Sequence, residues 1–127
     1  MGKAEEAKEK FDAELSKLRE LEKQHTKYVS NRRILETQLT ENKMVKEELE
    51  FLVEGEVVMK LIGPTLLKQD TEEVKVNVNK RIEYIESEIK RLETTMGQHG
   101  KALEDQRNIL EKQQAALKTA IAAQAGS

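Results

Sequence analysis

Apolar residues in the second half of the chain recur at the spacing of a coiled coil. Steps of four and three residues, taken alternately from Val78 to Ala120, reach an apolar residue at ten of thirteen positions, where the 37% apolar composition would give about five. This seven-residue repeat aligns the a and d positions of a coiled coil along one stripe of a helix. The pattern therefore predicts a long helix over residues 71–123. Its a row is entirely apolar and contains Ile82, Ile89, Met96, Leu103, Leu110 and Leu117.

The first half of the chain repeats this pattern, but its stronger apolar row lies at the d positions, as Leu21, Leu35 and Leu49 show. In an antiparallel pair of helices, an a position of one helix shares a layer with a d position of the other, so the two strong rows would meet. We therefore expect a helix over residues 4–53 that packs antiparallel against the second helix. We also expect Asn42, a polar residue at a d position, to set the register of the pair.

The register that matches the most large apolar residues makes the numbers of facing residues add to 131. It places His25 opposite Gln106 and Arg32 opposite His99. Registers shifted by one heptad in either direction remain open, and one of them would bring His25 and His99 into the same layer. The facing pairs of the preferred register include Leu49 with Ile82, Leu35 with Met96, Tyr28 with Leu103, Leu21 with Leu110, Leu39 with Leu92 and Phe11 with Ala120.

Between the two helical stretches the period of the sequence changes to that of extended strands. From Val57 to Ile62 every residue but Lys60 is apolar, so both faces of an extended strand would carry apolar side chains. Gly63-Pro64 interrupts this run, and a second extended run follows from Thr65 to Gln69. This pattern predicts a β-hairpin over residues 56–69. A two-stranded hairpin is at best marginally stable in water, so apolar residues on both of its faces indicate that it packs against partner chains.

Two local signals mark where the helices should stop and start. Gly55 stands where the first helix is expected to end. Asp70, followed three residues later by Glu73, has the form of an N-cap with a capping box for the second helix.

Composition and charge exclude several classes of protein. The chain is 36% charged and 3% aromatic, which does not favour a large globular core. Its 22 basic and 24 acidic residues leave a net charge of −2, so neither nucleic acid nor a membrane surface is an expected partner. The absence of cysteine suits a reducing compartment, and the sequence shows neither a membrane span nor a secretory signal, so we expect a cytoplasmic protein.

No residues of the chain suggest catalysis or cofactor binding. His25 and His99 are the only histidines, and two ligands are too few for a zinc site. No phosphate-binding GxxxxGK loop occurs, and the many Glu and Lys residues are spaced as helix-surface ion pairs. We therefore expect no catalytic residue, cofactor or metal.

Three consecutive stretches resemble the β-type subunits of prefoldin: QLTENKMVKEEL at residues 38–49, LIGPTLLKQ at 61–69 and KRIEYIESEIKR at 80–91. The outer parts of the chain share only coiled-coil character with that family. The resemblance implies a heterohexamer with other α- and β-type subunits, in which the hairpins join a β-barrel platform. It further implies that the tips of the coils hold unfolded proteins such as nascent actin and tubulin without ATP, and deliver them to a group II chaperonin.

Two sets of residues are the candidates for these roles. The assembly segment combines the apolar and turn residues of the hairpin: Val57, Val58, Met59, Leu61, Ile62, Gly63, Pro64, Leu66 and Leu67. The client-binding tip combines large apolar residues near both termini, where the alanine-rich end of the second helix fills the seam between the helices poorly. These residues are Phe11, Leu15, Leu18, Leu110, Leu117 and Ile121.

Two other functions fit a coiled coil. One is a structural tether or spacer, in which the antiparallel coil only sets a distance and binds no client. The other is a parallel homodimeric zipper, which the Gly63-Pro64 break and the complementary a and d rows disfavour.

Overall fold

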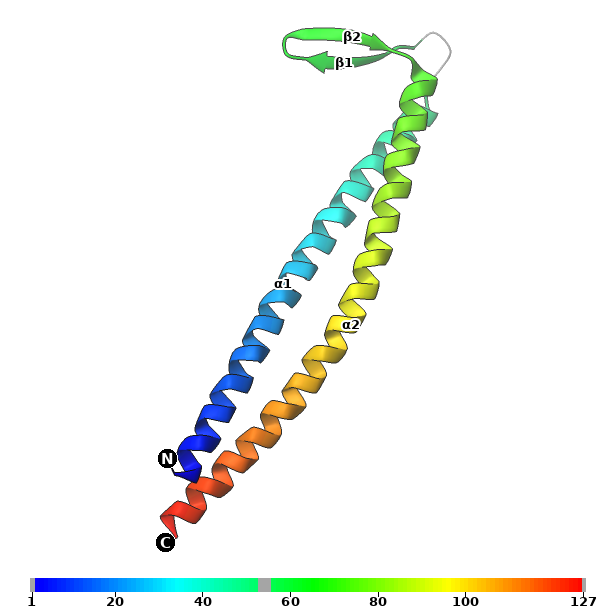
Figure 1. Ribbon diagram of the computed structural model, residues 1–127. Coiled ribbons are helices and arrows are strands. Elements are labelled where there is room, and N and C mark those ends of the chain that lie inside the picture. The colour runs from blue at the N-terminus through cyan, green and yellow to red at the C-terminus, as the bar shows by residue number, and fades with distance from the viewer. Residues whose placement is uncertain (1, 53–55, 127) are drawn as a thin grey trace. The chain divides into compact units, whose positions relative to one another are not determined.

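The computed structural model describes residues 2–52 and 56–126, which form two long helices joined through a β-hairpin (Figure 1). The order along the chain is α1 (Lys3–Glu50), β1 (Val58–Ile62), β2 (Thr65–Gln69) and α2 (Thr71–Ala125). The predicted class of fold, two long antiparallel helices with a central hairpin, is confirmed. The chain divides into two compact units. We call residues 1–30 with 93–127 the terminal unit, and residues 31–92, which include both strands, the hairpin unit.

Helix α1 contains neither glycine nor proline, and Glu5 and Glu6 lie in its first turn, where the helix dipole favours negative charge. The helix ends at Glu50 rather than at the predicted residue 53. The N–H of Phe51 donates to the carbonyl of Glu48 at 3.2 Å, and that of Leu52 to the carbonyl of Leu49 at 3.4 Å. These three-residue steps tighten and close the last turn. Gly55, the predicted stop, lies outside the described residues.

Helix α2 begins at Thr71, as predicted, and Asp70 is its N-cap. The Oδ1 atom of Asp70 accepts a hydrogen bond from the backbone N–H of Glu73 at 3.1 Å. The helix continues to Ala125, two residues beyond the predicted end, because its alanine-rich last turns have high helix propensity.

The hairpin has the predicted turn and ends at the predicted Gln69, but its first strand begins at Val58 and not at the predicted residue 56. Strand β1 pairs antiparallel with β2 from Val58 opposite Gln69 to Ile62 opposite Thr65, which leaves Gly63 and Pro64 as a two-residue loop. Gly63 has a φ of 59°, a value that glycine adopts without the steric cost of a Cβ atom, while the ring of Pro64 fixes a negative φ. A positive φ followed by a negative one is typical of the II′ turn, which matches the twist of a hairpin.

The core of the hairpin unit is a small cluster at the ends of the helices that flank the hairpin. Leu49, Val78 and Ile82 are between 4% and 8% exposed and form this cluster. The half-buried apolar residues that pack against it are Leu39, Leu52, Val58 and Val74. The hairpin is thus tied to its own coil through Val58.

The contacts between the helices correct the preferred register by one heptad. In the terminal unit, His99 stacks on His25, so the facing numbers add to 124 and not to 131. In the hairpin unit, Asn42 lines a groove with Arg81 and Ile85, whereas the preferred register placed it opposite Ile89. The register with His25 and His99 in one layer is therefore the one adopted. Matching apolar pairs alone favoured the other register, because it took no account of the polar residues that meet in this one.

Candidate functional site

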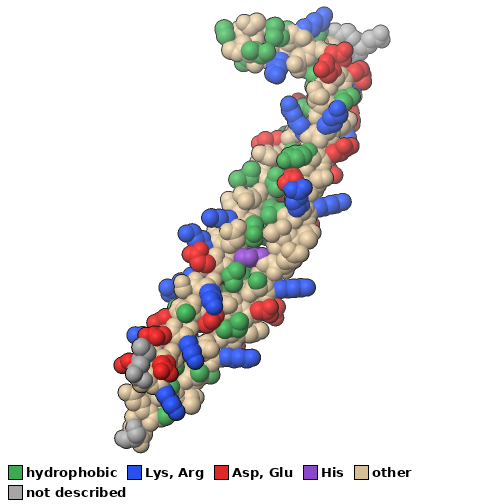
Figure 2. Space-filling view, in the orientation of Figure 1, with side chains coloured by type: hydrophobic (Ala, Val, Ile, Leu, Met, Phe, Trp, Pro, Cys, Tyr) green, Lys and Arg blue, Asp and Glu red, His purple; other side chains and the backbone are tan. Residues whose placement is uncertain are grey.

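The hairpin exposes most of its large apolar side chains, and hydrophobic side chains appear as patches on the hairpin in Figure 2. Six of them are between 46% and 66% exposed, values that are high for residues of this type. Strands β1 and β2 form a sheet of two strands, so within the described chain each has one edge without a neighbouring strand. The six exposed residues are Val57, Met59, Leu61, Ile62, Leu66 and Leu67.

Apolar side chains project from both faces of this sheet. Because successive residues of a strand point to opposite faces, Met59 and Leu61 share one face with Leu66, which pairs with Leu61 across the strands. Ile62 and Leu67 lie on the other face. Val58 differs from its neighbours, since it packs against the core cluster of its own coil. The hairpin is therefore anchored to its own coil through Val58, while its other large apolar side chains stay exposed.

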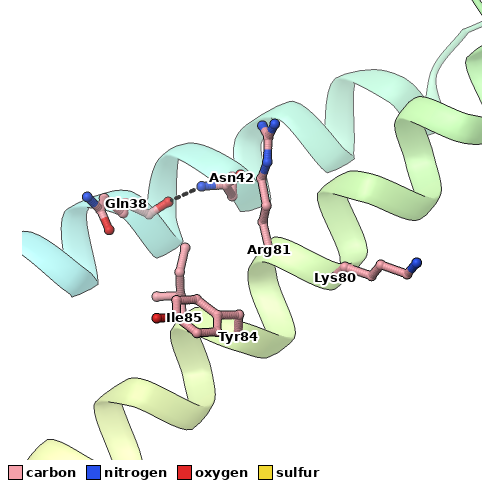
Figure 3. A pocket seen from close by; sticks show the side chains of 6 residues that line it. All are labelled: Gln38, Asn42, Lys80, Arg81, Tyr84 and Ile85. Carbon is pink, nitrogen blue, oxygen red and sulfur yellow. Dashed lines mark hydrogen bonds between the residues drawn. The ribbon is translucent and has the colours of Figure 1, made fainter.

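A shallow groove runs between the helices of the hairpin unit, lined by Gln38, Asn42, Lys80, Arg81, Tyr84 and Ile85 (Figure 3). Asn42, the polar d residue predicted to set the register, makes a hydrogen bond within its own helix. Its Nδ2 atom donates to the backbone carbonyl of Gln38, one turn earlier in the same helix, at 2.7 Å. Met59 and Leu61 of the hairpin line a second groove with Arg81, so this side of α2 continues into the hairpin surface.

The six predicted tip residues all lie in the terminal unit, but they differ in exposure. Ile121 is 52% exposed, whereas Leu18 is buried, at 8%, and contributes to packing in this conformation. The remaining four, Phe11, Leu15, Leu110 and Leu117, are half-buried.

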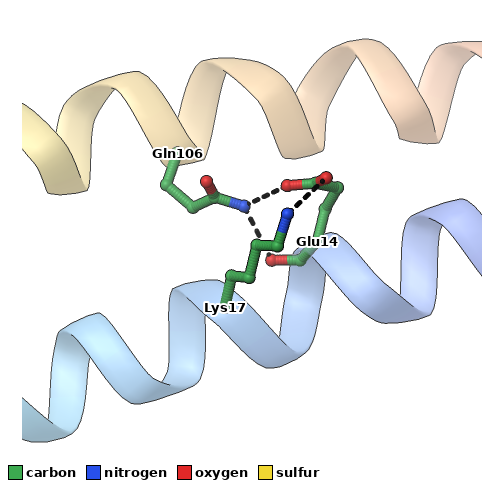
Figure 4. Close-up of polar contacts among 3 residues, drawn as sticks. All are labelled: Glu14, Lys17 and Gln106. Carbon is green, nitrogen blue, oxygen red and sulfur yellow. Dashed lines mark hydrogen bonds and ion pairs between the residues drawn. The ribbon is translucent and has the colours of Figure 1, made fainter.

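Polar contacts that the heptad pattern did not predict join the two helices of the terminal unit (Figure 4). Gln106, at 8% exposure, donates from Nε2 to the backbone carbonyl of Glu14 at 3.0 Å and also to its carboxylate. Lys17 lies 3.3 Å from the other carboxylate oxygen of Glu14. The hydrogen bond from Gln106 lowers the pKa of the Glu14 carboxyl, Lys17 lowers it further, and desolvation opposes both.

A second polar layer lies one heptad away. The Nε2 atom of His99 is 2.7 Å from the backbone carbonyl oxygen of Leu21, which requires the N–H to be on Nε2. Its ring stacks on that of His25, with centroids 6.2 Å apart and planes 4° apart, and packs nearly perpendicular to the ring of Tyr28, with centroids 5.2 Å apart. The signal available in the sequence was the polar interruption of both helices at His25, His99 and Gln106.

The part of the chain that the structure describes offers little chemistry beyond these contacts. Within residues 2–52 and 56–126, no group of three or more His, Asp or Glu side chains is placed to hold a metal ion. No helix in those ranges is both long and apolar enough to span a membrane. The exposed hairpin and the terminal unit are therefore the parts of the chain that could carry its function.

Comparison with known sequences gives one consistent family. The model of the family described as "Prefoldin subunit" matches residues 12–126. The chain is 43% identical over 124 residues to "Prefoldin subunit 6" of Homo sapiens, covering 98% of this chain and 96% of the relative. It is 44% identical over 116 residues to "Probable prefoldin subunit 6" of Caenorhabditis briggsae, covering 91% of each chain.

The fold is also similar to that of a solved structure. The crystal structure of the prefoldin beta subunit from Thermococcus strain KS-1 superposes with a TM-score of 0.72 at 22% sequence identity. The match covers 80% of this chain and 90% of that one. It supports the arrangement of two helices about a central hairpin, independently of the sequence comparisons.

Proposed function

The chain belongs to the prefoldin subunit family, and from this premise we propose that it is an ATP-independent holding subunit of a heterohexameric chaperone. In this proposal the hairpin joins the chain to other α- and β-type subunits. The terminal unit then binds unfolded proteins. The uncovered apolar hairpin carries the proposal, because it needs partner chains to remain stable in water.

The assembly step follows from the energetics of the hairpin. Burying an apolar side chain of this size stabilises a complex by about 1.5 to 3 kcal/mol relative to leaving it exposed. Six such side chains are about half exposed or more on a sheet of only two strands. Sister hairpins could add strands to both open edges and cover both faces, as closure into a barrel requires.

The holding step relies on apolar side chains of the terminal unit. Ile121 is exposed, and Phe11, Leu15, Leu110 and Leu117 are half-buried in a seam that small and polar residues fill poorly. Each contact with an exposed apolar segment of a client would be weak. Several coils of one hexamer could nevertheless act on the same client, since linked weak sites bind far more tightly than single ones.

The family resemblance supplies the remaining parts of the proposal. It implies nascent actin and tubulin as clients and a group II chaperonin as the acceptor of the held chain. The lack of cysteine and the balanced surface charge agree with a cytoplasmic location, where both clients are made.

The experiment that tests the proposal combines the chain with sister subunits of its own complex. The mass of the mixture is measured, followed by the aggregation of chemically denatured actin diluted into it without ATP. We expect a hexamer that suppresses aggregation. Failure to form a hexamer would reject the assembly role, and a hexamer that leaves aggregation unchanged would favour a tether or spacer.

A triple variant, Phe11→Ser, Leu15→Ser and Ile121→Ser, locates the client site. We expect it to assemble normally and to suppress aggregation several-fold less well than the parent. The matched control is Ile34→Ser, Met44→Ser and Val76→Ser, which removes three exposed apolar side chains from the hairpin unit and should leave holding unchanged. Equal holding by the triple variant and the parent would place the client site elsewhere.

A further inference from the structure

Two side chains of α2 make the same contact with α1, one heptad apart. Gln106 donates to the carbonyl of Glu14, and His99 to the carbonyl of Leu21. Because the helices are antiparallel, the two contacts lie in successive heptads of the same coil. In each contact the side chain of α2 lies opposite one residue of α1 and bonds to the backbone carbonyl of the residue one turn before that one.

The carbonyls alone would not select this register. Every turn of a helix offers a carbonyl at its surface, so after a slip of one heptad Gln106 could bond to Leu21, and His99 to Tyr28. These replacement bonds would make the two registers nearly equivalent. The difference between the registers must lie in side chains that occur only once along α1.

Three side chains of α1 meet that condition. The carboxylate of Glu14 accepts a second hydrogen bond from Gln106, and a slip toward the register preferred from apolar matching would replace it with an apolar leucine. His25 stacks on His99, and the ring of Tyr28 packs nearly perpendicular to that of His99. The slip would bring the cation of Arg32 opposite His99 instead.

The register adopted decides which residues face each other toward the chain ends. Continuing outward from the His25–His99 layer, Phe11 faces Gln113, Glu14 faces Leu110, and Ala7 faces Leu117. Each of these large apolar side chains thus faces a small or polar residue. All of the residues in these layers are half-buried and none is buried.

We propose that Glu14, His25, His99 and Gln106 form a register key in the terminal unit. The key holds the coil in the register that keeps Leu110 opposite Glu14, whereas the slip would bury Leu110 against Leu21. Leu110 is thereby kept available to an unfolded chain, while Phe11 and Leu117 face small or polar residues in either register. The register itself depends only on the contacts above, whereas the consequence for client binding rests on the proposed holding function.

Pairs of introduced cysteines can report the register, because the chain has no cysteine of its own. Phe11→Cys with Gln113→Cys forms a disulfide in the adopted register, and Phe11→Cys with Ala120→Cys forms one after a slip of one heptad. Each pair is introduced into the full chain, assembled with its sister subunits and oxidised in a glutathione buffer. The yields of the two intramolecular disulfides are then compared. In the parent, we expect the first pair to dominate.

Gln106→Glu tests the key with a change of almost no volume. In the adopted register the new carboxylate would oppose that of Glu14, whereas after the slip it would face His25. Because a hydrogen bond to a charged group is worth roughly a tenfold change in an equilibrium, the disulfide ratio should shift at least about tenfold toward the second pair. An unchanged ratio would overturn the register key.

Two further variants show whether the effect acts through Glu14. Glu14→Gln combined with Gln106→Glu restores a donor and a carboxylate in exchanged positions, so the ratio should return toward that of the parent. A ratio that stays shifted would overturn the role of Glu14. Gln114→Glu makes the same chemical change at an exposed position of α2 and should leave the ratio unaltered.

Client holding is measured on the same variants without the cysteines. We expect Gln106→Glu to suppress actin aggregation several-fold less well, and the exchanged pair to recover. A shifted register with full holding would refute the link to the client site but leave the key intact. A parent complex that holds no client would instead reject the proposed function, whatever its register.

Discussion

The Oδ1 atom of Asp70 accepts a hydrogen bond from the backbone N–H of Glu73, at 3.1 Å, on the first turn of α2. Asp70 is the residue between the last strand of the hairpin and the helix. Its side chain satisfies one of the four N–H groups that the start of a helix leaves without partners. The cap therefore fixes the point at which the hairpin ends and helix α2 begins.

We expect Asp70→Ala to lower the free energy of unfolding by about 1 kcal/mol, the usual cost of removing an N-cap side chain. Urea denaturation of the full chain followed by circular dichroism measures this change. Asp70→Asn keeps an oxygen that accepts from the N–H of Glu73 and should cost much less. If both variants matched the parent, the cap would contribute nothing to stability.

Leu49 is the member of the core cluster that α1 supplies, and it is 7% exposed. We expect Leu49→Ala to cost about 2 kcal/mol, the lower end of the range for leucine deletions, because this core is small and close to solvent. The same denaturation experiment measures the loss. Met44→Ala removes a side chain that is 57% exposed and should stay within about 0.5 kcal/mol of the parent. Equal effects of the two changes would mean that the cluster is not a core.

The elements of this fold were predictable because each has a local signal in the sequence. The heptad repeat indicates the helices, Gly63-Pro64 indicates the turn, and Asp70 indicates the start of α2. The end of α1 at Glu50 was not predictable in this way. The bonds that close its last turn, from Phe51 and Leu52, have no side-chain signature.

The register was not predictable, because a coiled coil that slips by one heptad presents the same kinds of position to its partner. The register depends on whether Gln106 meets Glu14 and whether His99 meets His25. These residues lie far apart in the sequence, so their contacts cannot be read from it. The exposed hairpin was predictable from apolar residues on both faces of a short strand. The turning of Val58 toward its own coil was not, since it depends on how the hairpin lies against the cluster.

The exposed apolar side chains of β1 and of the residue before it offer a test of assembly. We expect Val57→Ser, Met59→Ser and Leu61→Ser together to abolish formation of the hexamer, because the burial of three large apolar side chains is lost. The helix content should change little, since none of the three lies in the core cluster. Native mass spectrometry and circular dichroism measure the two properties.

The control for this experiment is Ile34→Ser, Met44→Ser and Val76→Ser, which changes three exposed apolar residues of the helices. We expect this variant to assemble like the parent. A hexamer formed by the hairpin variant would show that the strands are not the assembly surface. Loss of helix in the hairpin variant would show that the strands stabilise the coil itself.

The Glu14 carboxyl should make the stability of the terminal unit depend on pH. Its pKa lies below the ordinary value of 4.5, chiefly because it accepts a hydrogen bond from Gln106, with a further contribution from Lys17. A carboxyl with a lower pKa in the folded chain binds fewer protons there than in the unfolded chain. Its stabilising contribution is therefore complete above its unfolded pKa and is lost as the pH falls through the folded pKa.

Glu14→Gln removes this titration and keeps an oxygen that can accept from Gln106. Between about pH 6 and about pH 3 we therefore expect the melting temperature of the variant to fall less than that of the parent. All other carboxyl groups are common to the two chains, so the difference between their melting curves reports Glu14 alone. Parallel curves would show that the carboxylate of Glu14 is not stabilised by its contact with Gln106. A steeper fall in the variant would mean that the folded chain raises the pKa of Glu14 and does not lower it.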